Sequence, residues 1–175
     1  MQKLGNNLPT KFNLIVNSNN FLIQRANIND APILAGLIGQ LLLDFNVNGG
    51  TNFNIDLNLL TLNSRALLQR ENFGGFIALE TNTNEPIGAI TISLASAIYN
   101  GGDFGVITEF YVKDDYRSKG LGKILIKTAL DFARSQNWNI VEVGAPNKSE
   151  WPRTIEFYKQ NGFLEKGPKL RIHLD

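Results

Sequence analysis

The sequence predicts an α+β domain in which helices flank a mixed, largely antiparallel central sheet. Two segments with apolar residues at helical spacing come early in the chain, and three apolar, β-branched segments separated by polar turns follow them. Helical and extended segments then alternate. The expected order is β-α-α-β-β-β-α-β-α-β-β, in a single domain over residues 21–175 that follows an arm of uncertain order, residues 1–20. A chain of 175 residues with 43% hydrophobic content can bury one sizeable core and is too short to expect two.

The first third of this domain is expected to hold one strand and two helices. Residues 21–26, FLIQRA, form a short apolar strand, and Asn29 or Asp30 then provides a helix cap. Apolar residues recur at helical spacing over residues 31–45, which predicts a helix with a broad apolar face. After a polar loop, a second helix is predicted over residues 57–70.

The middle third is expected to form an antiparallel meander of three strands. Residues 76–80 and 87–95 flank the polar turn TNTNEP and predict a hairpin. The segment VITEFYV, residues 106–112, supplies the third strand. A helix is then predicted from about Gly122, after the segment KDDYRSKGLGK.

The last third of the chain is expected to add three strands to the sheet, with a helix between the first strand and the second. NIVEVGAP, residues 139–146, predicts a strand, and SEWPRTIEFYKQNG predicts a helix with Pro152 in its first turn and Gly162 at its end. Two short strands, FLEK at residues 163–166 and KLRIHL at residues 169–174, are predicted to close the chain.

The composition excludes several classes of site. The formal charge of +1 gives no global field that would draw the protein to nucleic acid or anionic lipid, so any anion site must be local. There is no cysteine, which excludes thiolate catalysis, and the one histidine, His173, cannot build a multi-histidine metal site. We find neither a leader-peptide pattern nor a stretch of about 18 apolar residues. We therefore expect a cytoplasmic protein with no membrane segment, no nucleic-acid partner and no metal.

The segment RSKGLGK is the strongest candidate for a binding site. Its glycines permit positive φ and close backbone approach, so several N–H groups can point at one anion, and the following helix adds its positive end. A Walker A loop would need glycine in place of Arg117 and serine or threonine in place of Ile124. A dinucleotide-binding loop would need glycine in place of Leu125. Both readings fail, which leaves a phosphate cradle of another kind.

Two motifs resemble the GCN5-related N-acetyltransferases. The acetyl-CoA loop of that family has the form Arg/Gln-x-x-Gly-x-Gly/Ala, and RSKGLG, from Arg117 to Gly122, matches every defined position. A later helix of the family typically ends in tyrosine, three residues, then Gly-Phe, which is the spacing of Tyr158 and Gly162-Phe163. The resemblance implies an acyl-CoA N-acyltransferase-like fold. It covers the element order of most of the chain, while its specific motifs lie within residues 109–163.

By this resemblance, acetyl-CoA is the expected co-substrate. The backbone N–H groups of residues 119–123 would bind its pyrophosphate, and the preceding strand would pair with its pantetheine arm. The expected cofactor-binding residues are therefore Phe110, Tyr111, Val112, Arg117, Ser118, Lys119, Gly120, Leu121, Gly122 and Lys123. For Arg117, a role in loop structure and a phosphate contact are both open. Asn147 is a further candidate, although the family's usual asparagine position, seven residues before the tyrosine, is here Trp151.

The resemblance also implies two catalytic residues. Tyr158 would act as the general acid that protonates the departing CoA sulfur, with simple packing of the helix end as the alternative. Glu109 shares a strand face with Tyr111 by alternation and would accept the ammonium proton or bind the amine. A solvated or salt-bridged strand carboxylate is the alternative for Glu109.

The implied activity is an acetyl-CoA-dependent N-acetyltransferase in which a primary amine attacks the thioester directly. The acceptor would be a small molecule, possibly polyamine-like in character, with a peptide as the less favoured choice. A non-catalytic acyl-CoA-binding or sensor module with the same fold is the alternative. A structural protein with a chance glycine turn would require both motif matches to be coincidences. A homodimer is expected by analogy alone.

Overall fold

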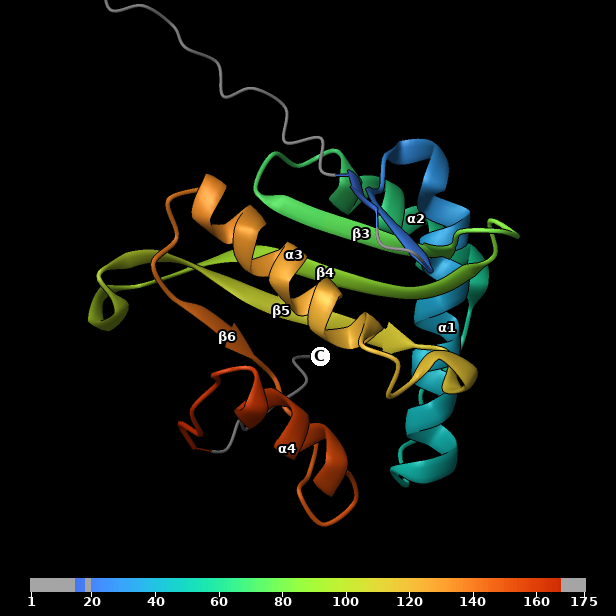
Figure 1. The fold of residues 1–175 in the computed structure, drawn as a ribbon. Coiled ribbons are helices and arrows are strands. Elements are labelled where there is room, and N and C mark those ends of the chain that lie inside the picture. Colours follow the sequence, from blue (N-terminus) through green and yellow to red (C-terminus); the bar gives the residue numbers. More distant parts are fainter. Residues whose placement is uncertain (1–14, 18–19, 168–175) are drawn as a thin grey trace, which may run out of the picture.

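The computed structural model describes residues 15–17 and 20–167, which form one twisted sheet with helices on both faces (Figure 1). Six strands lie in the order of the chain, and each neighbouring pair is antiparallel except β5 and β6, which are parallel. The strands are β1 Ile15–Asn17, β2 Phe21–Arg25, β3 Phe73–Glu80, β4 Pro86–Ala97, β5 Gly102–Val112 and β6 Val141–Val143. The α-helices are α1 Ala31–Asn48, α2 Leu57–Leu68, α3 Leu121–Ser135 and α4 Pro152–Gln160.

The helices divide the core into two apolar clusters. Alternate residues of a strand point to opposite faces, so neighbours such as Phe76 and Ile77 enter different clusters. On one face, α1 packs Leu34, Leu37 and Ile38 against Ile77, Ala89 and Tyr111. On the other, α3 packs Leu125 and Phe132 against Phe76 and Ile90, and α4 adds Tyr158 to the same cluster.

The predicted fold class is confirmed, with two changes at the ends of the chain. A short strand, β1, lies within the segment expected to be an arm, where it pairs with β2. The predicted strand FLEK does not form. Phe163 packs edge-on against Tyr158, and the Glu165 carboxylate pairs with Lys159 of α4 at 3.2 Å, so this segment stays with α4. The predicted strand KLRIHL, with His173, lies outside the described residues.

Helix α1 is longer than predicted. It continues through Asn48 and ends where the Gly49 N–H bonds the Phe45 carbonyl, so the loop expected from residue 46 begins three residues later. With the turn before it, residues Ile28–Asn48 are long and apolar enough to cross a membrane by length and composition alone, a test that the buried core helix of a globular protein also passes. The inner side of this helix is buried against the sheet.

Candidate active site

The loop between β5 and α3 leaves several backbone N–H groups without an acceptor among the described residues. It makes a short 3₁₀ turn, Asp114–Tyr116, and then enters the left-handed region twice, at Ser118 with φ 61° and at Gly120 with φ 87°. The Lys123 N–H already bonds the Gly120 carbonyl at 3.1 Å, which removes it from the predicted set of phosphate donors. Five other N–H groups have no acceptor among the described residues, and they belong to Ser118, Lys119, Gly120, Leu121 and Gly122.

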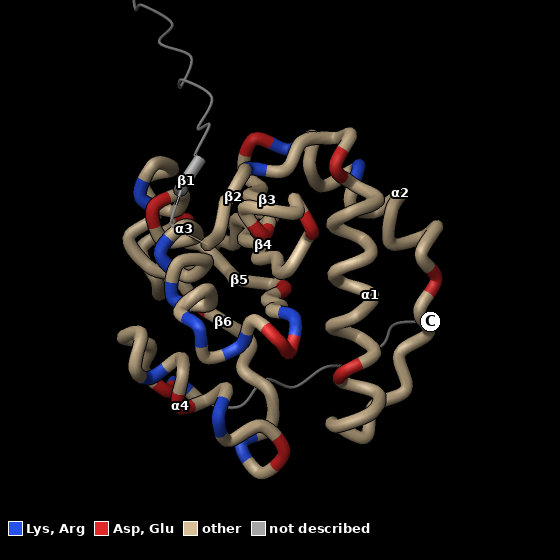
Figure 2. Tube along the Cα trace, turned by 45° about the vertical axis from the view of Figure 1, so that its right-hand side comes forward, with Lys and Arg blue, Asp and Glu red and all other residues tan. Residues whose placement is uncertain are grey.

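These free donors lie at the positive end of a helix of 15 residues. We call this loop, residues 118–122, the anion cradle, and that it binds an anion stays a prediction. Figure 2 shows basic residues along α3 and α4 near this loop, with acidic residues among them, while most of α1 and α2 carries no charge.

Arg117 has a structural role in this loop. Its Nε donates to the Val112 carbonyl at 2.9 Å, and its guanidinium bonds Asp44 of α1 at 2.6 Å and Asp114 at 2.8 Å. The guanidinium carbon also lies 6.0 Å from the centre of the Tyr111 ring. Arg117 thus ties the loop to α1 and to the end of β5, and a contact with phosphate stays a prediction.

The two glycines of the motif serve different purposes. Gly120 has open space around the position of a Cβ atom, but its positive φ disfavours any side chain. At Gly122 a Cβ would lie 3.1 Å from Phe157 and 3.3 Å from Phe110, whose rings are stacked with centres 5.6 Å apart. Gly122 therefore lets the first turn of α3 lie directly on this aromatic pair.

Glu109 lies in a β-bulge. Ile90 pairs with Phe110 and Ile92 with Ile107, so Thr108 and Glu109 together oppose the single residue Thr91. The Thr91 hydroxyl accepts the Glu109 N–H at 3.0 Å and also bonds the Glu109 carboxylate. The Thr108 hydroxyl donates to the same carboxylate oxygen at 2.7 Å.

The bulge fixes Glu109 on the face of the sheet that α1 and α2 cover. Thr91 is only 1% exposed and lies between Ile90 and Ile92, which both face the α3 side. Thr91 and its partner Glu109 therefore point to the α1 side, as does Tyr111, whose ring packs in that cluster. The structure thus agrees with the shared face predicted for Glu109 and Tyr111. It shows hydroxyl partners for the carboxylate instead of a salt bridge among the described residues.

Beside Glu109 the sheet opens. Strands β5 and β6 pair only from Gly105 to Ile107, opposite Val141 to Val143. Beyond this point, residues 108–112 have no neighbouring strand on the β6 side among the described residues. Phe110, Tyr111 and Val112 therefore present a free strand edge that leads to the anion cradle. An unpaired edge of this kind can bond an extended ligand through its main chain.

Tyr158 lies on the other face of the sheet from Glu109. It is 7% exposed and packs against Phe110, Phe157 and Phe163, with ring centres between 5.6 and 6.2 Å apart. Burial raises the pKa of the Tyr158 phenol well above its ordinary value, so the phenol keeps its proton at neutral pH. No group of the described residues hydrogen-bonds the hydroxyl. Tyr158 is thus a protonated group available as a donor.

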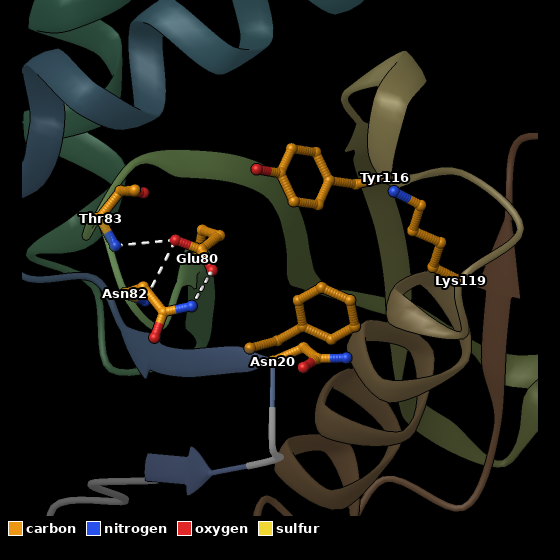
Figure 3. Close-up of a pocket in the computed structure, with 7 residues that line it drawn as sticks. Asn20, Glu80, Asn82, Thr83, Tyr116 and Lys119 are labelled. Atoms are coloured by element: carbon orange, nitrogen blue, oxygen red, sulfur yellow. Dashed lines mark hydrogen bonds between the residues drawn. The ribbon is translucent and has the colours of Figure 1, made fainter.

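A pocket of about 380 Å³ adjoins the anion cradle (Figure 3). Lys119 and Tyr116 line one side, with the Lys119 ammonium 5.4 Å from the centre of the Tyr116 ring. Glu80 lines the other side, where its carboxylate accepts hydrogen bonds from Thr83 and Asn82 that lower the Glu80 pKa. The Glu80 carboxylate is therefore engaged in its own turn.

A second pocket, of about 210 Å³, lies where the end of α1 meets the connection from β6 to α4. Trp151 lines it and packs edge-on against Phe45, with ring centres 5.5 Å apart. Asn147 also lines it, and its side-chain oxygen accepts bonds from the Ser149 N–H and hydroxyl. Asn147 thus shapes the local turn, and its predicted contact with CoA is not tested by this geometry.

Sequence reasoning missed the residues that position the site from a distance. Thr91 and Thr108 hold Glu109, Asp44 holds Arg117, and Phe45 builds the second pocket with Trp151. Of these residues, only Thr91 could have been identified from the sequence, because it is a polar residue at an inward position of an apolar strand. Among the described residues, no group of three or more acidic or histidine side chains is arranged to hold a metal ion.

Comparison with known proteins agrees with this geometry. The model of the acetyltransferase (GNAT) family matches residues 50–163. An uncharacterised N-acetyltransferase from Methanocaldococcus jannaschii is 36% identical over 103 residues, which are 57% of this chain and 43% of that protein. The chain therefore aligns with less than half of the length of this relative.

Solved structures share the fold at low sequence identity. A predicted acetyltransferase from Clostridium acetobutylicum, crystallised with acetyl-CoA, matches with a TM-score of 0.72 and 20% identity, over 87% of this chain and 96% of that one. An aminoglycoside acetyltransferase from an uncultured soil metagenomic sample, in complex with trehalose, matches with a TM-score of 0.66 and 24% identity, over 90% and 97% of the two chains.

Proposed function

The chain belongs to the acetyltransferase (GNAT) family, and on that premise we propose that it transfers the acetyl group of acetyl-CoA to a primary amine of a small molecule. One observation carries the proposal. The free edge of β5 runs from Glu109 to the anion cradle, and the two candidate proton-transfer groups lie on opposite faces of the sheet beside it. A peptide amine is the less favoured acceptor.

The cradle and the free edge would position the co-substrate. The N–H groups from Ser118 to Gly122 would bind the pyrophosphate, and residues 108–112 would bond the pantetheine arm as an added strand. Holding the thioester and the amine together in the gap would supply much of the rate, because proximity replaces an encounter in solution. A predicted acetyltransferase solved with acetyl-CoA shares this fold, which supports acetyl-CoA as the co-substrate.

Glu109 and Tyr158 would divide the proton transfers between them. The amine would approach from the α1 side, where Glu109 accepts its proton directly or through water. The nitrogen forms a bond to the thioester carbonyl carbon, the C–S bond breaks as the tetrahedral intermediate collapses, and Tyr158 would donate its proton to the leaving sulfur from the α3 side. The chain lacks cysteine, which suits direct attack without an acyl-thiol intermediate on the protein.

The decisive experiment measures binding and turnover separately. Calorimetry with CoA tests the cradle, and a thiol reagent reports CoA release from acetyl-CoA over a panel of amines. We expect both binding and amine-dependent release. Binding with no release over a broad panel would favour the acyl-CoA sensor, and absence of binding would contradict both. The cytoplasmic location and the homodimer expected from the sequence stay predictions.

A matched pair of glycine variants tests the cradle itself. Gly120→Asp places a side chain and a negative charge at the anion site, and should abolish CoA binding. Gly101→Asp is the control, because Gly101 also has positive φ and open space around its Cβ position but lies at the tip between β4 and β5. It should bind CoA normally. Equal CoA affinity in the two variants would refute the assignment of the loop.

A further inference from the structure

One face of helix α4 contacts both ends of the anion cradle. Arg153 and Phe157 are four residues apart on α4, so their side chains leave the helix on the same side. The Phe157 ring lies 3.1 Å from the position that a Cβ atom would take at Gly122. One turn earlier, the Arg153 guanidinium donates to the Ser118 hydroxyl at 3.4 Å. Ser118 and Gly122 are the first and last residues of the cradle, so this face of α4 lies along it.

Arg153 brings a positive charge to the cradle that no described carboxylate balances. Its side chain is exposed and forms no ion pair among the described residues. Arg117, the arginine of the loop motif, differs in this respect because it pairs with the carboxylates of Asp44 and Asp114. The positive charge of Arg117 is therefore already offset within the protein, whereas the charge of Arg153 is not.

The contact between Arg153 and Ser118 is one that a bound anion could replace. A distance of 3.4 Å is long for a hydrogen bond, and a neutral hydroxyl is a weaker partner for a guanidinium than a phosphate oxygen. The backbone N–H groups from Ser118 to Gly122 lie beside it and have no acceptor among the described residues. A guanidinium next to unpaired N–H groups suits a phosphate, because its planar fork can donate to two oxygens at once.

We propose that Arg153 binds the pyrophosphate of acetyl-CoA from α4, together with the backbone N–H groups of the cradle. The pyrophosphate would then be held by two segments, the loop after β5 and the helix that follows β6. Because Tyr158 also lies on α4, the same contact would hold the proposed general acid beside the bound co-substrate. This inference rests on the proposed function and adds a binding residue to it.

Calorimetry with two ligands tests the contact. CoA carries a pyrophosphate and a 3′-phosphate, whereas 3′-dephospho-CoA carries the pyrophosphate alone. Arg153→Gln should weaken the binding of both ligands by at least about tenfold, because a charge-assisted hydrogen bond to phosphate is lost. Weaker binding of CoA alone would assign Arg153 to the 3′-phosphate and overturn the proposal. Unchanged binding of both ligands would also refute it, while the proposed function would stand on the CoA affinity of the wild-type protein.

Matched variants separate a local contact from a general effect of charge. Arg153→Lys keeps the positive charge but loses the planar fork, so it should recover part of the affinity for both ligands. Arg65→Gln is the control, because Arg65 is also an exposed arginine without an ion pair among the described residues, but it lies on α2. It should bind both ligands as tightly as wild type. An equal loss of affinity in Arg65→Gln and Arg153→Gln would contradict a contact at Arg153.

Pantetheine, which carries no phosphate, tests whether Arg153 acts by shaping the gap. Its binding to wild type and to Arg153→Gln is followed by nuclear magnetic resonance, so the result does not depend on acetyl transfer. We expect the two proteins to bind pantetheine equally tightly, because the variant removes only an exposed side chain outside the apolar core. Weaker pantetheine binding in Arg153→Gln would show a role in the shape of the gap and overturn the phosphate contact.

Discussion

Replacing Tyr158 with phenylalanine separates its chemistry from its packing. The variant loses one hydroxyl and keeps the ring that contacts Phe110, Phe157 and Phe163. No described residue hydrogen-bonds this hydroxyl, so its removal leaves no described group without a partner. We therefore expect the free energy of unfolding at neutral pH to change by less than about 1 kcal/mol.

At alkaline pH the free energies of unfolding of wild type and Tyr158→Phe should differ. Burial raises the Tyr158 pKa in the folded state above the value of about 10 that tyrosine has in the unfolded chain. Below that pH both states hold the proton and stability is unaffected. Above it the unfolded state releases the proton while the folded state retains it, so the free energy of unfolding falls by up to about 1.4 kcal/mol per pH unit. Phenylalanine cannot titrate, so Tyr158→Phe should lack this loss.

Urea denaturation at a series of pH values, from neutral to above about 10, measures the free energy of unfolding of wild type and Tyr158→Phe. The other titrating groups are the same in both proteins, so the difference between the two curves reports on Tyr158. Tyr99→Phe is the control, since Tyr99 is 83% exposed and lies outside the core. If wild type and Tyr158→Phe lost stability in parallel above that pH, the phenol would not be held in a buried, protonated state.

The same variant tests the catalytic role. Loss of a general acid should lower kcat by about 100-fold or more, while the affinity for CoA, measured by calorimetry, stays within a factor of about 2. Unchanged kcat would remove Tyr158 from the mechanism and support the packing alternative. Unchanged CoA affinity together with the alkaline difference would show that the variant is folded.

Two further substitutions address the residues around the site. Gly122→Ala should lower the free energy of unfolding by about 1–3 kcal/mol in urea denaturation, because the added Cβ presses on the rings of Phe157 and Phe110, and an unchanged stability would mean that these rings shift freely. Thr91→Val should cost about 1–3 kcal/mol and lower kcat, because the Glu109 N–H loses its acceptor and the carboxylate loses a donor. Thr91→Ser should restore kcat, and failure to do so would argue against a positioning role for the hydroxyl.

Local periodicity predicted most of the fold because each helix and strand buries one face. The apolar spacing of residues 31–45 and the alternation in β3 to β5 are direct consequences of packing on a sheet. The strand FLEK was predicted wrongly because a strand also needs a partner edge. Phe163 instead packs on α4, which a short sequence pattern does not reveal.

The candidate site was predictable where it depends on neighbours in the chain. The glycines of the loop, and the spacing from Tyr158 to Phe163, involve residues that are close together in the sequence. In the structure, five N–H groups of the loop have no acceptor among the described residues. The bulge at Glu109 was not predicted, because the adjacent polar residues Thr108 and Glu109 do not by themselves show that both oppose the single residue Thr91. The second pocket, at the end of α1, could not be predicted because Phe45 and Trp151 are far apart in the sequence and meet only in the folded chain.

Strands β5 and β6 pair over a short length, so a ligand bound between them would affect the stability of the protein. Strand β6 pairs with β5 over three residues, and Tyr158 in the described chain beyond it packs in the apolar cluster on the α3 side. An acyl-CoA bound in the gap would add main-chain bonds that the described residues do not form with each other. On the proposed function, the co-substrate would therefore act as a temporary added strand beside β5, and its binding energy would add to the stability of the protein.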